Sequence, residues 1–297
     1  MRTRLTVAAI AAASALLLTG CVDNSAPPTD NNAAPGAEIQ VDQAAEALLP
    51  DEIREAGKLM IGMDIGYAPN EFKKEDGSAD GWAVELGNAM AAKLGLTTEY
   101  QQSAFDRIIP AVNGGTFDIG YSSFTDTAER EQSVDFVNYY NAGVQWAQQI
   151  GKAVNPDDAC GLTVSVQATT YEETEELPAK SAACEAAGKE PINILKFESQ
   201  DEATNALALG RADAMSADSP ITQYAVAQVS DKIELAGDAF EVAPYGIAVA
   251  KGSELAAALQ AALQSLVDDG TYMDILTKWG VQDGAIDEIT INAATKG

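Results

Sequence analysis

The sequence predicts an α/β protein built from two lobes. Short apolar strands alternate with helices along the chain, and this order is typical of mostly parallel sheets covered by helices on both faces. The segment that can fold, residues 45–292, is about 250 residues long, which reaches the usual limit of one core and favours two lobes. Two stretches of the chain also share one turn and strand pattern.

The first lobe begins with a buried strand at residues 59–63. A helix is expected next, because an apolar side chain recurs at every fourth position, at Trp82, Leu86, Met90 and Leu94. Gly95 is expected to end this helix.

Two more strands of the first lobe are expected at residues 96–101 and 117–121. Between them, Ser103 is followed three positions later by Asp106, which resembles the capping pair at the start of a helix. A further helix is expected to begin near Thr127.

The second lobe repeats the alternation. We expect strands at residues 162–166, 192–195 and 212–216, with a helix at 201–209. The chain then returns to the first lobe, where a helix capped by Ser253 is expected to pack through one apolar stripe, formed by Leu255, Leu259, Leu263 and Leu266.

The two lobes share one sequence pattern at the start of a strand. Residues 115–118 read Gly-Thr-Phe-Asp and residues 210–213 read Gly-Arg-Ala-Asp, and each strand ends five residues after its Asp, at Ser123 and at Asp218. Ligands of open α/β sheets bind at the carboxyl ends of strands, so these two ends predict the site. Chance similarity of two Gly-x-x-Asp turns is the alternative.

Two basic residues and a short apolar run open the chain. Arg2 and Arg4 precede an apolar run at residues 5–18, and Leu-Thr-Gly-Cys follows at 18–21. This pattern is typical of a secretory signal peptide, which we expect at residues 1–20. The run is shorter than the ~20 residues that span a membrane. Its end resembles the bacterial lipobox, which implies a lipid on Cys21; ordinary secretion with an incidental cysteine is the alternative.

The segment after Cys21 is poor in large apolar side chains. Residues 22–38 therefore cannot bury enough surface to fold. We expect a flexible tether at residues 21–44, in which the roughly 17 residues after Cys21 would hold the folded part about 20 to 25 Å from the lipid on average.

The composition is strongly acidic. The chain has 45 acidic and 18 basic residues, a formal net charge of −27, and removal of Arg2 and Arg4 makes the charge more negative. Such a surface repels nucleic acid and anionic lipid, so no nucleic-acid partner is expected. The charge does not identify a ligand, because solubility in salt or in a cell wall accounts for it equally well.

Two cysteines remain after Cys21. In an exported protein, Cys160 and Cys184 are expected to pair as a disulfide. The alternatives are a metal site or a catalytic thiol, but the chain contains no histidine. That absence removes the Ser-His and Cys-His nucleophile pairs and the common zinc sites. No metal or cofactor is expected.

Nine short motifs, in their order and spacing, resemble the extracellular solute-binding proteins that serve polar amino acid ABC transporters. They lie at residues 67–72, 76–82, 104–110, 122–130, 134–136, 164–170, 210–213, 245–248 and 269–272. The resemblance covers nearly the whole folded part. It implies a periplasmic-binding-protein-like fold in which an amino acid lies in a cleft between the lobes.

The resemblance implies a role for each group of the ligand. An α-amino acid presents a carboxylate, an ammonium and a side chain that the site must satisfy separately. Arg130 would clamp the carboxylate, since a guanidinium fork can pair both oxygens, with help from Thr125, Thr169 and Thr170. A surface ion pair of Arg130 with a neighbouring glutamate is the alternative.

Asp218 would receive the ligand's ammonium, and it can also cap the helix that follows. Ser123 would supply further oxygen atoms from the first lobe. Tyr67 and Phe105 would form walls around the ligand side chain, although both could be ordinary core residues.

Two positions concern the ligand side chain itself. Asn70 stands where many relatives of this family carry an aromatic residue, so one wall is expected to be thinner or more polar. Asp64, on the loop that leaves the first strand, points to a polar ligand such as glutamine, arginine or lysine. The alternative is that Asp64 and Glu71 only brace the loop.

These expectations define the organisation of the chain. Lobe 1 would comprise residues 45–149 and 246–297, and lobe 2 residues 150–245. The protein would be a monomer, held on the outer face of the bacterial cell membrane by the Cys21 lipid, that captures an L-amino acid and delivers it to ABC permease subunits. We expect no enzymatic activity. The alternatives are an enzyme on the same scaffold, such as a dehydratase, and a surface receptor that serves no transporter.

Overall fold

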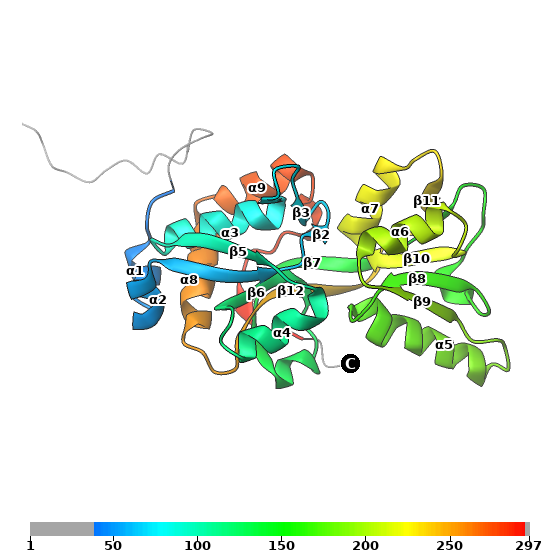
Figure 1. The fold of residues 1–297 in the computed structure, drawn as a ribbon, viewed down its shortest axis with the longest axis horizontal. Helices are drawn as coiled ribbons and strands as arrows, with labels where there is room; N and C mark the ends of the chain where they lie inside the picture. The colour runs from blue at the N-terminus through cyan, green and yellow to red at the C-terminus, as the bar shows by residue number, and fades with distance from the viewer. Residues whose placement is uncertain (1–38, 295–297) are drawn as a thin grey trace, which may run out of the picture. The chain divides into compact units, whose positions relative to one another are not determined.

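The computed structural model describes residues 39–294 of the chain, and the strands and helices alternate along it as the sequence predicts (Figure 1). The predicted signal peptide and Cys21 lie outside the described residues. The strands are β1 Lys58–Met63, β2 Gly66–Tyr67, β3 Glu71–Lys73, β4 Ala79–Asp80, β5 Thr97–Gln102, β6 Ile119–Thr125, β7 Val134–Gln149, β8 Thr163–Gln167, β9 Asn193–Phe197, β10 Ala214–Asp218, β11 Ile233–Leu235, β12 Phe240–Ala250 and β13 Thr290–Ile291.

The helices flank these strands. They are α1 Gln43–Glu46, α2 Asp51–Ala56, α3 Trp82–Lys93, α4 Phe105–Asn113, α5 Leu177–Ala186, α6 Gln200–Ala208, α7 Ser219–Gln228, α8 Leu255–Asp268 and α9 Thr271–Trp279, with 3-10 turns at Arg130–Gln132, Pro156–Asp158 and Gln282–Gly284 and a π-helix at Glu172–Glu176.

The main sheet has two parallel parts joined by long antiparallel strands. Its order is β5-β1-β6-β12-β7-β10-β8-β9, with β11 and β13 also paired to β7. Strands β5, β1 and β6 are parallel to one another, as are β10, β8 and β9, whereas β7 and β12 pair antiparallel with each other and with the flanking strands. The α/β class is therefore confirmed. We call the elements around β5-β1-β6 the first half and those around β10-β8-β9 the second half.

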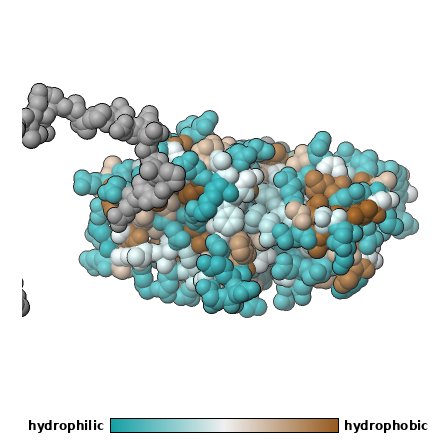
Figure 2. All heavy atoms as spheres, turned by 90° about the horizontal axis from the view of Figure 1, so that it is seen from above, coloured by the Kyte–Doolittle hydropathy of each residue, from teal (hydrophilic) through white to brown (hydrophobic). Residues whose placement is uncertain are grey.

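Each half has its own apolar core. In the first half, Trp82 and Leu86 of α3 and Leu259 of α8 are fully buried in one cluster. In the second half, Trp146 of β7 packs with Leu177 of α5 in another. Fully burying one such side chain contributes about 1.5–3 kcal/mol, so each half is held by its own packing. Hydrophilic residues cover most of the face shown in Figure 2, in line with the acidic composition.

The predicted lobe boundaries, 45–149 with 246–297 and 150–245, stay a prediction. The ordered part begins earlier than expected, because α1 starts at Gln43, inside the range predicted as tether. Asp42 caps this helix by accepting hydrogen bonds from the amides of Ala44 and Ala45, and Ala45 is buried.

Two predicted helix starts are wrong. Helix α4 begins at Phe105 after Ala104, and the Ser103 side chain donates to the Ala104 carbonyl instead of capping the helix. The helix expected near Thr127 is only a 3-10 turn, Arg130–Gln132, although the Thr127 hydroxyl does accept a hydrogen bond from the Arg130 amide. A longer helix does not fit here, because strand β7 already begins at Val134, two residues after the 3-10 turn ends.

Cys160 and Cys184 form a disulfide in the second half, as predicted, with their Cα atoms 5.5 Å apart. Cys184 is buried in helix α5, and Cys160 packs against the same cluster. The bond ties α5 to the loop before β8.

Candidate functional site

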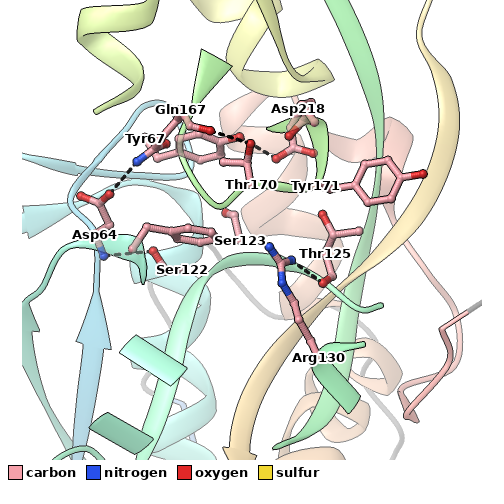
Figure 3. A pocket seen from close by; sticks show the side chains of 12 residues that line it. Asp64, Tyr67, Ser122, Ser123, Thr125, Arg130, Gln167, Thr170, Tyr171 and Asp218 are labelled. Atoms are coloured by element: carbon pink, nitrogen blue, oxygen red, sulfur yellow. Dashed lines mark hydrogen bonds between the residues drawn. The ribbon is translucent and has the colours of Figure 1, made fainter. Parts of the chain in front are cut away.

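One pocket brings together residues from both halves of the sheet at the carboxyl ends of strands (Figure 3). The first half contributes loops after β1 and β6, and the second half contributes the ends of β8 and β10. The lining residues are Asp64, Tyr67, Phe105, Ser122, Ser123, Thr125, Arg130, Gln167, Thr170, Tyr171, Glu172 and Asp218. This is the location that the two matching strand ends predict.

Arg130 is the one basic residue that lines this pocket. Its Nη1 donates to the carbonyl of Thr125 at 2.7 Å and its Nη2 to the carbonyl of Thr169 at 2.8 Å. The guanidinium carbon also lies 5.7 Å from the ring centres of both Phe105 and Phe124. Burial lowers the pKa of Arg130 from its ordinary value, while the negative charges of Glu172 and Asp218 oppose that shift. The guanidinium is thus a positioned cation, since arginine stays charged in proteins.

Asp218 ends β10 on the opposite half and is buried. Its Oδ2 accepts a 2.6 Å hydrogen bond from the hydroxyl of Tyr67, which belongs to the first half. Burial raises the pKa of Asp218 to about 6, against the hydrogen bond from Tyr67 and the positive charge of Arg130. Although Asp218 precedes α7, its side chain makes no capping hydrogen bond, so its carboxylate is directed to the pocket.

Asp64 lies on the other side of the pocket from Arg130 (Figure 3). Its Oδ2 accepts a 2.9 Å hydrogen bond from Nε2 of Gln167, which ends β8 in the second half. Burial raises the pKa of Asp64, and the hydrogen bond from Gln167 opposes this. Asp64 and Gln167 thus form a second polar bridge between the halves.

Asn70 does not line the pocket but supports one of its walls. It is fully buried, its Nδ2 donates to the hydroxyl of Ser123 at 2.9 Å, and its Oδ1 accepts from Nε1 of Trp82 at 2.7 Å. The Ser123 hydroxyl in turn donates to Glu71 at 3.0 Å. Ser123 has a φ of 50°, in the left-handed region, so this network fixes an uncommon backbone conformation. Asn70 therefore acts on the pocket through Ser123.

The two threonines of the second half differ in place. Thr170 lines the pocket, and its hydroxyl donates to the carbonyl of Gln167 at 2.9 Å. Thr169 is exposed, does not line the pocket, and contributes its carbonyl to Arg130. Thr169 has a φ of 64°, in the left-handed region, just after strand β8 ends, and in this conformation its carbonyl accepts the hydrogen bond from Arg130.

Four lining residues were not predicted: Ser122, Gln167, Tyr171 and Glu172. Gln167 could have been found, because it ends a strand of the second half just as Asp218 does. Ser122 immediately precedes the predicted Ser123, and its hydroxyl accepts a hydrogen bond from the Asp64 amide. Glu172 and Tyr171 follow Thr170 with no spacing signal of their own.

Within residues 39–294, no group of three His, Cys, Asp or Glu side chains is arranged to hold a metal ion. In the same residues, no helix has the length and apolar character that a membrane span requires.

The model of the bacterial extracellular solute-binding proteins, family 3, matches residues 59–282 of this chain. The chain is 42% identical to the arginine-binding protein ArgT of Corynebacterium glutamicum over 94% of this chain and 92% of that protein. A solved ancestral arginine-binding protein bound to arginine is 33% identical, with a TM-score of 0.69, over 75% of this chain and 98% of that one. An ancestral amino acid-binding protein, described as a precursor of cyclohexadienyl dehydratase, is 34% identical with a TM-score of 0.68, over 78% and 99%.

The match of the family model and the identity to these relatives extend over the elements that form the pocket, and they agree with the motifs at the strand ends. This chain belongs to family 3 of the bacterial extracellular solute-binding proteins.

Proposed function

We propose that this protein captures a free amino acid outside the cell, with arginine as the preferred ligand, and delivers it to an ABC importer. The observation that carries the proposal is the separation of charge in one pocket: Arg130 and Asp64 lie on opposite sides, with Asp218 on the second half (Figure 3). A zwitterion with a cationic side chain meets an opposite charge at each of its three charged groups in such a pocket.

The α-carboxylate is assigned to Arg130. A guanidinium pairs a carboxylate through parallel N–H donors, and the hydroxyls of Thr125 and Thr170 lie in the same lining. The α-ammonium is assigned to Asp218. Tyr67 and Phe105 would enclose the methylene groups of the ligand, because both line the pocket and Tyr67 is buried.

The guanidinium of the ligand is assigned to Asp64. The Gln167 amide already donates to one oxygen of this carboxylate, and Ser122 holds its backbone amide. An apolar side chain would leave the half-buried Asp64 without a charged partner, which costs about 1–3 kcal/mol. The names of the C. glutamicum relative and of the ancestral structure, both arginine-binding, support the same ligand.

A thermal-shift screen of the twenty amino acids tests this function. A ligand present at 100 times its dissociation constant stabilises the folded protein by about 2.7 kcal/mol, so arginine should give the largest rise in Tm. Failure of every amino acid to raise Tm would overturn the proposal.

We propose binding rather than catalysis. One similar structure is described as a precursor of a dehydratase, so the alternative to test is that this protein converts a substrate into a product. Incubating the protein with arginine and with a cyclohexadienyl substrate of a dehydratase should return both unchanged. A product that forms in proportion to protein concentration would show an enzyme instead.

The cellular setting is also a proposal. Cys21, outside the described residues, would carry the lipid that holds the protein on the outer face of the membrane, where the permease subunits lie. A Cys21→Ser variant should appear in the culture medium while the wild type stays with the membrane fraction. Equal distribution of the two proteins would argue for ordinary secretion.

A further inference from the structure

Glu172 is a buried carboxylate in the pocket to which the assignments above give no role. It is 1% exposed, it lines the pocket, and its Oε1 has no hydrogen-bond partner among the described residues. Buried polar atoms in native proteins are nearly always paired, so an unpaired carboxylate oxygen that faces a ligand pocket indicates a donor supplied by the ligand.

The segment that carries Glu172 is unusual. It begins the π-helix Glu172–Glu176, directly after Thr170 and Tyr171, which also line the pocket. π-helices are rare in proteins, and those that do occur are often found at functional sites. Within this π-helix Glu172 lines the pocket, whereas Glu175 is exposed and does not line it.

The negative charges around Glu172 would be stabilised by a cation. Burial raises the pKa of Glu172 well above its ordinary value, and the nearby negative charge of Asp218 raises it further. Arg130 lowers the pKa of Asp218 through its charge, but among the described residues it forms no ion pair with Glu172 or Asp218; its Nη1 and Nη2 donate to the carbonyls of Thr125 and Thr169. The groups that donate to the Asp218 side chain are neutral tyrosine hydroxyls, with Tyr67 at 2.6 Å and Tyr245 beside it.

We propose that Glu172 is a ligand-binding residue that shares the α-ammonium of the bound amino acid with Asp218. An ammonium has three N–H donors, so it can serve both carboxylates and still bond an oxygen from the first half. The cation between them also relieves the repulsion of the two carboxylates. This inference rests on the proposed function, and it makes Glu172 the residue through which the site demands a free primary amine.

The test compares arginine with deaminoarginine, in which a hydrogen replaces the α-ammonium. Dissociation constants for both ligands are measured by calorimetry on the full purified chain, for the wild type, Glu172→Gln and the matched control Glu175→Gln. Hydrogen bonds to charged groups predict that Glu172→Gln weakens arginine by about tenfold or more. Deaminoarginine should bind Glu172→Gln and wild type alike, and Glu175→Gln should change neither ligand.

The outcomes separate the two proposals. If the wild type does not bind arginine, the proposed function fails. If the wild type binds arginine but Glu172→Gln weakens both ligands equally, or neither, the role of Glu172 is overturned. Should Glu172→Gln fail to fold, Glu172→Asp keeps the charge with a shorter reach, and it too should weaken arginine selectively; an unchanged ratio of the two constants would reject the proposal.

Discussion

The hydroxyl of Tyr67 donates a 2.6 Å hydrogen bond to Oδ2 of Asp218, joining residues 151 positions apart across the two halves of the sheet. Gln167 and Asp64 make a similar bridge, and so do Arg130 and the Thr169 carbonyl. Each of the three contacts includes at least one residue that lines the same pocket, although Thr169 itself does not line it. A bound amino acid must therefore replace or extend contacts that already hold the halves together.

Arginine affinity should fall as the pH is lowered below about 6. Burial raises the pKa of Asp218 to about 6, and the ammonium binds only the ionised carboxylate. Below that pKa, binding must first remove the proton, so the dissociation constant rises by up to about tenfold per pH unit. Above it, Asp218 is already ionised and adds no further change to the constant.

Calorimetry from pH 4.5 to 8 in one ionic strength measures this dependence. Asp218→Asn is the control, since it should bind arginine weakly and lose the rise below pH 6. A rise that persists in Asp218→Asn would assign the effect to another carboxylate of the pocket whose pKa burial raises, namely Glu172 or Asp64.

Arg130→Ala should abolish amino acid binding in a protein that remains folded. The substitution leaves the ligand carboxylate buried without its charge partner, a loss of about 3–5 kcal/mol. Arg107→Ala is the matched control, because the Arg107 side chain is 80% exposed outside the pocket. If Arg130→Ala binds arginine as tightly as Arg107→Ala does, Arg130 does not bind the ligand's α-carboxylate.

Replacing Cys160 and Cys184 together with serine should lower stability without changing the pocket. The two cysteines are 24 positions apart, and removing the bond should reduce the free energy of unfolding by about 3.5 kcal/mol. Urea unfolding with and without reductant measures the loss. Neither cysteine lines the pocket, so arginine affinity should stay unchanged at low temperature. A large loss of affinity in the folded variant would contradict this independence.

The sequence predicts the strand ends well and the local starts of helices poorly. Ser123 and Asp218 end β6 and β10 within two residues, because apolar runs and following polar residues mark buried strands directly. Ser103 has the residue type of a helix cap, yet its amide bonds to the Met63 carbonyl and its hydroxyl to Ala104. Contacts with residues outside the helix therefore determine the conformation of Ser103, and the spacing of residues in the sequence does not predict such contacts.

The same limit applies to the pocket. Arg130, Asp64 and Asp218 were predicted because each follows a strand in a recognisable motif. Glu172 was not, since its importance lies in its burial and in an oxygen without a hydrogen-bond partner among the described residues, and neither property has a sequence pattern. Asn70 was placed on a wall, but Ser123 stands between it and the pocket.

One calorimetric series tests the account most directly: arginine against citrulline, its uncharged isostere, with leucine and glutamate beside them, at fixed pH and salt. The pairing of a ligand guanidinium with Asp64 predicts that wild type binds arginine about tenfold or more tighter than citrulline, and that Asp64→Asn removes most of this difference. Leucine or glutamate binding tightest, or a preference for arginine that survives in Asp64→Asn, would contradict it.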